Sequence, residues 1–218
     1  MNLDWSIVWE YRWAFLFGVM NTVLLAVVTM LVAIPGGIVI MLMRNSPVRA
    51  LRGIATVYVE TFRATPLILL VYWIFYVMPR FGVHLPPFLT GVVALSLIVS
   101  AYNSETFRAG VNSIRKGQSD AGLALGMSKW QLQVKVILPQ ALRRVLPAFS
   151  NTWVSLFKDT SLVSVIAVSE LSYVSLQARA ESFRIFEILT AMAAIYWCLG
   201  YPQAKLVDWL NRKYEVKE

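Results

Sequence analysis

The sequence has few of the residues that catalysis and metal binding require. One cysteine (Cys198) and one histidine (His84) allow neither an internal disulfide nor a clustered set of metal ligands. No Ser-His-Asp set supports an enzyme, and the G-x-x-x-x-G-K-[ST] phosphate loop is absent from the sequence. We therefore expect no catalytic site, no metal site and no ATPase activity in this chain.

Charged residues are also scarce. They make up 15% of the 218 residues, against roughly 25% in ordinary soluble proteins. Apolar types reach 58%, and the mean hydropathy is +0.61. This composition excludes a disordered chain, and its excess of apolar surface needs lipid rather than water as the solvent.

Long uncharged runs predict an all-α membrane protein with about five transmembrane helices in a single domain, residues 1–218. The region after residue 145 allows two interpretations: either the fourth helix crosses with Lys158-Asp159 near its outer end, or the span is broken there. We favour the first, followed by a short, partly buried helix. The predicted spans are residues 14–43, 54–78, 85–108, 141–159 and 186–206.

The basic residues predict how these spans are oriented. Of the 20 Lys and Arg residues, 15 fall on one side of the predicted membrane and 5 on the other. Since cytoplasmic loops carry the excess of Lys and Arg, we expect the N-terminus outside and the C-terminus in the cytoplasm. The same bias accounts for the net charge of +8 without a nucleic-acid partner.

The longest polar stretch between spans is predicted to contain a short helix outside the membrane, at about residues 118–127. Asp120 suits the first turn of such a helix, and Gly126 suits its end. Two interpretations stay open on physical grounds: an amphipathic interfacial helix without a partner, or a helix on which another protein docks.

This stretch resembles a known motif. Asp120-Ala121-Gly122, Gly126 and Val136-Ile137-Leu138-Pro139 are similar to the EAA loop of permease subunits of bacterial ABC importers. The family pattern is E-A-A, three residues, G, nine residues, then I-x-L-P. Here Asp120 replaces Glu, Gly122 replaces Ala and Val136 replaces Ile.

Three further segments resemble motifs of the polar amino-acid permeases, of the histidine, glutamine and glutamate type. Residues 62–67 resemble F-R-x-T-P-L, residues 101–114 resemble A-Y-x-x-E-x-x-R-x-G-x-x-S-I, and residues 158–163 resemble K-D-T-S-L. Each lies on the span or loop that the hydropathy predicts, and all four motifs occur in the right order. By this resemblance the chain is identified as a member of that family.

The resemblance implies the fold of a type I ABC importer permease, with a cytoplasmic coupling helix, in the bacterial inner membrane. It also implies four kinds of partner: two ABC ATPase subunits that bind ATP and Mg, a second permease of the same or a similar chain, an extracytoplasmic amino-acid-binding protein, and membrane lipid. No cofactor is expected in this chain. The residues expected to dock the ATPase are Asp120, Ala121, Gly122, Leu123, Leu125, Gly126 and Met127.

A polar amino acid carries both a carboxylate and an ammonium group, so its path through lipid needs polar groups of both kinds. Ionisable residues inside membrane spans are costly and are functional candidates by default. The candidates for the substrate pathway are Asp159, Lys158, Arg63, Thr65, Pro66, Ser100, Asn103, Glu105, Asn151, Thr160 and Ser161.

Several of these residues have a structural alternative. Asp159 either binds the substrate ammonium, pairs with Lys158 or another basic group, or caps the following helix. Arg63 either lines a gate or pairs with Glu60 or Glu105. Thr65-Pro66 either bends the second span near the path or is a plain irregularity of the helix.

Three other functions compete with an amino-acid importer. The same architecture would serve an opine or an osmolyte, and the sequence does not distinguish these cargoes from an amino acid. An ATP-independent amino-acid transporter is disfavoured by the EAA-like loop and by the lack of a visible internal repeat. A membrane enzyme is disfavoured by the lack of a catalytic constellation.

Overall fold

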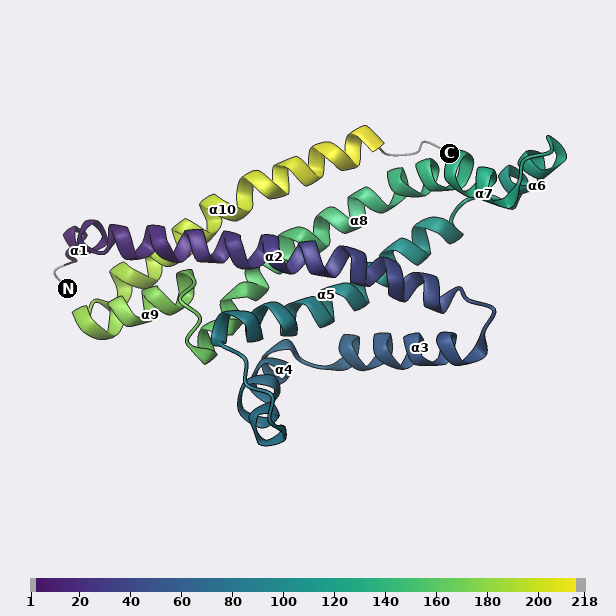
Figure 1. The fold of residues 1–218 in the computed structure, drawn as a ribbon. Helices are drawn as coiled ribbons and strands as arrows, with labels where there is room; N and C mark the ends of the chain where they lie inside the picture. The colour runs from purple at the N-terminus through teal and green to yellow at the C-terminus, as the bar shows by residue number, and fades with distance from the viewer. Residues whose placement is uncertain (1–2, 215–218) are drawn as a thin grey trace.

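The computed structural model describes residues 3–214, and within this range every regular element is a helix (Figure 1). Two π-helical turns, Trp73–Val77 and Gln133–Ile137, and two 3₁₀ turns, Met78–Phe81 and Thr160–Ile166, connect the α-helices. The α-helices are α1 (Ser6–Glu10), α2 (Arg12–Arg44), α3 (Arg49–Ala64), α4 (Leu67–Tyr72), α5 (Pro87–Asn112), α6 (Lys116–Ala124), α7 (Lys129–Leu132), α8 (Leu138–Asp159), α9 (Leu171–Ser182) and α10 (Ile185–Tyr214).

Three helices, α2, α5 and α10, are each long and apolar enough to cross a membrane. They contain most or all of the predicted spans 14–43, 85–108 and 186–206. Two further spans exist only if each of two bent helix pairs crosses as a unit, which gives three to five spans. This range includes the predicted number of about five.

The predicted span 54–78 is not one continuous helix. Its two halves, α3 and α4, meet at an angle of 106°. Thr65 adopts an extended backbone with ψ of 126°, because the ring of Pro66 disfavours helical geometry at the residue before it. The bend proposed for Thr65-Pro66 is therefore present, and it is sharp enough to end one helix and begin another.

The fourth predicted span, 141–159, lies within α8, which ends at Asp159 as expected. The partly buried 3₁₀ turn Thr160–Ile166 follows it, matching the short helix predicted there. α9 comes next, and Lys129–Ile166 and α9 together form the second bent pair, with an angle of 50°.

α2 lies along α5, and glycine allows their close approach (Figure 1). A Cβ added to Gly37 would lie 2.8 Å from the Cβ of Asn103 and 3.2 Å from the carbonyl oxygen of Ser100. The hydrophobic core includes Leu25 of α2, Leu95 of α5 and Leu156 of α8, all almost completely buried.

We expect Gly37→Ala to destabilise the bundle, because its methyl group would meet the backbone of α5, which cannot move away freely. Overpacking of this kind costs about 1–3 kcal/mol. Thermal unfolding of the purified protein in detergent measures the effect. Gly53→Ala is the matched control: no atom lies within 4 Å of its added Cβ. Equal unfolding midpoints for the two variants would contradict this account of α2–α5 packing.

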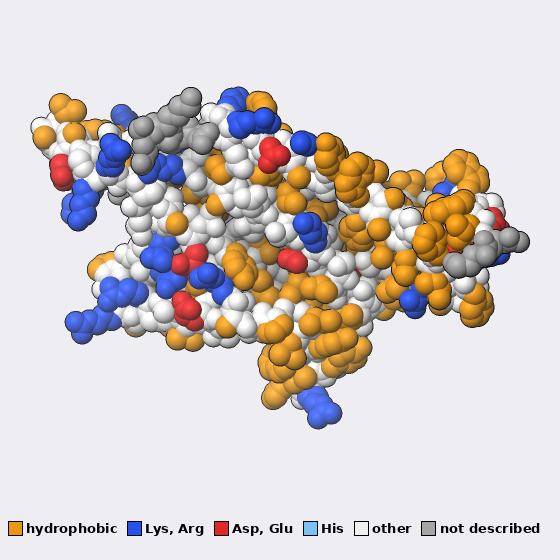
Figure 2. All heavy atoms as spheres, turned by 180° about the vertical axis from the view of Figure 1, so that it is seen from behind, with side chains coloured by type: hydrophobic (Ala, Val, Ile, Leu, Met, Phe, Trp, Pro, Cys, Tyr) orange, Lys and Arg blue, Asp and Glu red, His pale blue; other side chains and the backbone are white. Residues whose placement is uncertain are grey.

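The two ends of the bundle differ in charge. α1 and the α9–α10 turn lie at one end, whereas α6, α7 and the C-terminal part of α10 lie at the other (Figure 1). Figure 2 shows Lys and Arg side chains gathered at the end that carries α6, while hydrophobic side chains cover much of the remaining surface. This separation agrees with the sequence-based bias of basic residues toward one side.

Candidate docking and translocation sites

The predicted helix outside the membrane is α6, which begins at Lys116 and ends at Ala124, slightly earlier than the predicted range 118–127. Gly126 ends it in the left-handed conformation, with φ of +76°. The N–H of Gly126 donates to the carbonyl of Leu123 at 3.0 Å, and the N–H of Met127 donates to the carbonyl of Gly122 at 3.1 Å. This pair of bonds is a Schellman motif, in which glycine is favoured.

Gly122 has a packing role within the α6–α7 hairpin. It is buried, and an added Cβ would lie 2.6 Å from Cδ1 of Leu132 at the end of α7. Ser128 starts α7 with a capping box: its hydroxyl accepts from the N–H of Gln131, and the Gln131 side chain accepts from the N–H of Ser128. The α6–α7 hairpin is therefore stabilised by contacts within itself, namely the packing of Gly122 against Leu132 and the capping box of α7.

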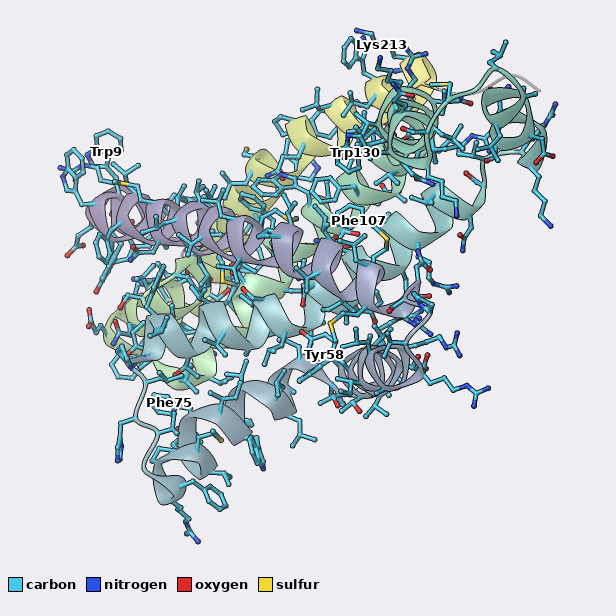
Figure 3. The ribbon with its side chains drawn as sticks, turned by 45° about the vertical axis from the view of Figure 1, so that its right-hand side comes forward. Trp9, Tyr58, Phe75, Phe107, Trp130 and Lys213 are labelled. Carbon is cyan, nitrogen blue, oxygen red and sulfur yellow. The ribbon has the colours of Figure 1, made fainter. Side chains whose placement is uncertain are left out.

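Three apolar side chains of this hairpin are exposed. Leu125 is 83% exposed and Leu123 is 49% exposed, although both belong to a polar segment outside the predicted spans. Trp130 of α7, labelled in Figure 3, is 76% exposed and was not among the predicted docking residues. We call Leu123, Leu125 and Trp130 the hairpin patch. The sequence signal by which Trp130 could have been predicted is a large aromatic residue in an otherwise polar loop.

A charged cluster joins α2, α3 and α5. Glu105 of α5 accepts hydrogen bonds from Arg44 of α2 and from Arg108, whose Nε and Nη2 lie 3.1 and 2.7 Å from its oxygens. Arg44 also lies 3.8 Å from Glu60 of α3. Arg63 has no ion pair among residues 3–214, so of its two alternatives the pairing with Glu60 or Glu105 is wrong.

Arg63 instead places its guanidinium carbon 5.5 Å from the ring centroid of Tyr102 on α5. This distance suits a cation–π contact. Both side chains are exposed, so the pair lies on the open surface of α3 and α5.

Three predicted pathway residues lie inside the protein instead of on an open surface. Ser100 is bonded to the hydroxyl of Tyr58 at 2.8 Å, and Thr160 donates to the carbonyl of Phe157 at 2.7 Å. Asn103 is completely buried between α2 and α5. All three side chains are buried by the packing of other segments, which the pattern of one segment does not reveal.

A polar stripe does run along α8. Asn151 and Ser155 are exposed and Asp159 is half-buried, and their spacing of four residues places them on one side of the helix. Ser155 was not predicted. A groove of about 440 Å³ between α5 and α8 lies along the same side of α8, toward its N-terminus. It is lined by Glu105, Thr106, Ala109, Gly110, Ser113, Arg144 and Ala148.

Lys158 and Ser161 lie on a different side, in a groove of about 640 Å³ between α8 and α10. Ser172 and Tyr196 also line it, and neither was predicted, because only the folded chain brings α9 and α10 against the end of α8. We call this the α8–α10 groove. Thr65 and Pro66 lie elsewhere, at the α3–α4 bend. Among residues 3–214, no group of three or more His, Cys, Asp and Glu side chains is placed to hold a metal ion.

Comparison with known proteins finds relatives that match nearly the whole chain, and all of those described below are membrane components of transport systems. The family model described as "Binding-protein-dependent transport system inner membrane component" matches residues 33–216. The L-cystine transport system permease protein TcyB of Bacillus subtilis is 40% identical over 215 residues, covering 98% of this chain and 92% of the relative. The glutamine transport system permease protein GlnP of Escherichia coli is 34% identical over 223 residues, covering 99% and 100%.

Two solved structures of ABC transporters contain chains that are similar to this one. A crystal structure of an amino acid ABC transporter with histidines has a chain that is 31% identical, with a TM-score of 0.92, covering 98% of this chain and 100% of that one. A chain of the MetNI methionine ABC transporter in an inward-facing conformation has a TM-score of 0.69 at 18% identity, covering 92% and 98%. At that identity the second likeness shows a shared fold.

Proposed function

This chain belongs to the family of inner membrane components of binding-protein-dependent transport systems, and we propose that it is the membrane-spanning permease subunit of an ABC importer for polar amino acids. The observation that carries the proposal is its likeness to amino-acid permeases over nearly the whole chain. The exposed hairpin patch, at the position of the EAA-like loop, supports the same function.

The absence of a nucleotide-binding motif from the sequence indicates which roles belong to partner subunits. The chain has no phosphate loop, so we assign ATP and Mg binding to two partner ATPase subunits. A second permease, identical or similar, completes the membrane part, and an extracytoplasmic binding protein delivers the amino acid. The basic end with α6 and the C-terminal part of α10 then faces the cytoplasm, and the N-terminus lies outside.

The hairpin is well placed to transmit force. The guanidinium of Arg144 on α8 donates to the carbonyl of Ser113, which ends α5 three residues before α6 begins. Gly110 of α5 approaches α8 so closely that a Cβ there would lie 2.2 Å from Cγ2 of Val145. An ATPase that holds the hairpin patch and moves would therefore move α5 and α8 together, as a rigid body.

The substrate path is proposed along the polar stripe of α8. An unpartnered row of polar side chains facing lipid would be costly, so the stripe is expected to face a second subunit or a water-filled path. Asp159 offers its carboxylate to the ammonium group of the amino acid in transit. Arg63 lies on the same open surface as Tyr102, and the α3–α4 bend at Thr65-Pro66 frees backbone carbonyls there.

Reconstitution tests the function. The chain is purified with its ATPase and binding protein, placed in lipid vesicles, and challenged with amino acids while ATP hydrolysis and uptake are measured. We expect at least one polar amino acid to stimulate hydrolysis and to accumulate. Stimulation by an opine or a betaine alone would replace the cargo, and no stimulation by any of these compounds would contradict the function.

In the same assay Asp159→Asn should lower uptake about tenfold while assembly is kept, since a charge-assisted hydrogen bond contributes about 1.5–3 kcal/mol. Asp208→Asn is the matched control, because Asp208 is exposed near the C-terminal end of α10. Equal uptake by both variants would remove Asp159 from the path.

A further inference from the structure

The α8–α10 groove combines an apolar wall with a few polar groups. It measures about 640 Å³, large enough for a small ligand. Phe157 and Trp197 contribute to the apolar wall, and the polar groups come from Lys158, Ser161, Ser172 and Tyr196.

The hydroxyls on one side of the groove are backed by a buried carboxylate. Tyr196 donates to Oε2 of Glu170 at 2.8 Å and lies 2.9 Å from the hydroxyl of Ser172. Glu170 is 0% exposed and also accepts from the backbone N–H groups of Ser172 at 2.9 Å and Tyr173 at 2.7 Å. Among residues 3–214, no Lys or Arg forms an ion pair with Glu170. The carboxyl group of Glu170 therefore fixes the position of the Tyr196 hydroxyl, and the Ser172 hydroxyl lies next to it.

The other side of the groove carries a cation. Lys158 is exposed at the end of α8, and no carboxylate in the described part of the chain lies within ion-pair distance of its ammonium. The hydroxyl of Ser161 donates to the carbonyl of Lys158 at 2.7 Å, which leaves the oxygen of this hydroxyl able to accept a further bond. Lys158 thus places a positive group on the α8 wall of the groove, and hydroxyl oxygens held by the buried carboxyl group of Glu170 lie on the α9–α10 wall.

We propose that the α8–α10 groove is a binding site for a zwitterionic amino acid with a neutral side chain. The ligand carboxylate binds the ammonium of Lys158, and the ligand ammonium donates to the hydroxyls of Ser172 and Tyr196. The side chain lies against Phe157 and Trp197. A basic side chain would need a second carboxylate, and an acidic one a second cation, and the groove lining contains neither.

This inference rests on the proposed function and deepens it by naming a binding site and a substrate class. Asp159 does not line the groove in the described structure, so the ammonium contact in the groove differs from the one proposed for the path. Binding in the groove and passage along α8 are then separate steps, and variants of the two sets of residues distinguish them.

Protection from chemical labelling tests the site. Ser161→Cys is introduced in a Cys198→Ser background, because Cys198 is exposed, and the complex with its ATPase is treated with a methanethiosulfonate reagent. We expect saturating L-glutamine to slow labelling about tenfold or more, whereas L-arginine and the primary amide of glutamine, which lacks the carboxylate, do not. His84→Cys, exposed in the loop before α5 and outside both the groove lining and the hairpin, is the control and should label equally in all cases.

A second measurement separates a binding role from a structural one. Tyr196→Phe removes one hydroxyl and should raise the KM for glutamine uptake about tenfold, the range expected for a lost hydrogen bond to a charged group. Tyr173→Phe removes a hydroxyl that bonds Gln177 outside the groove and should leave KM unchanged. Co-purification of the ATPase with each variant reports correct folding.

The outcomes separate this proposal from the function on which it rests. If amino acids stimulate ATP hydrolysis but none protects the Ser161→Cys variant, the groove site is overturned and the importer stands. Protection by arginine equal to that by glutamine would overturn the neutral substrate class. If no amino acid stimulates hydrolysis, the proposed function itself fails.

Discussion

Leu125→Asp should release the ATPase from the membrane subunit and stop ATP-driven uptake, while the helical fold is retained. Leu125 is 83% exposed, so its side chain contributes little to the stability of the subunit itself. As part of the hairpin patch it is proposed to be buried by the ATPase, where an aspartate would lose its hydration without gaining a partner. Apolar anchors in the centre of an interface contribute about 2–4 kcal/mol, so docking should weaken roughly a hundredfold.

Co-purification of the ATPase in detergent measures docking, and uptake by vesicles measures coupling. Gly117→Asp is the matched control, because it adds the same charge to the same helix at a position where an added Cβ meets no atom within 4 Å. There the carboxylate lies in the first turn of α6, where negative charge is favourable. If the Leu125→Asp variant still bound the ATPase and transported, the hairpin patch would not be the docking surface.

Glu105→Gln should destabilise the subunit more than any other single change in the charged cluster. Only 20% of the Glu105 side chain is exposed, and it holds both Arg44 and Arg108. Glutamine keeps the size but removes the charge, which leaves two partly buried guanidinium groups without their counter-ion. Breaking a fully buried pair costs about 3–5 kcal/mol, and the remaining exposure of this cluster lowers the expected cost to roughly 2 kcal/mol.

Thermal unfolding in detergent tests this prediction. The control is Glu60→Gln, since Glu60 is 66% exposed and lies 3.8 Å from Arg44, a geometry for which about 0–1 kcal/mol is typical. A Glu105→Gln variant that unfolds like the wild type but loses uptake would place Glu105 in the substrate path, as the sequence first suggested. A lower midpoint would support a role in joining α2 and α5.

Local chemistry explains why much of the fold was predictable. Uncharged runs located α2, α5 and α10, because a helix in lipid must be apolar over its own length. Gly126 was correctly predicted as a helix end, since only a residue that tolerates positive φ suits that position. The family followed from four short motifs, and the comparisons confirm it. The roles of the docking and pathway residues stay predictions.

Contacts between distant segments were decided only by the tertiary structure. The sequence by itself determined a lipid-embedded helical chain with an exposed loop helix, because composition, spacing and backbone chemistry act over a few residues. It did not determine that α3 and α4 meet at 106°, that Asn103 is buried against α2, or that Arg63 lies over Tyr102. Glu170 and Tyr196 are 26 residues apart, and they meet behind the α8–α10 groove only because α9 packs against α10.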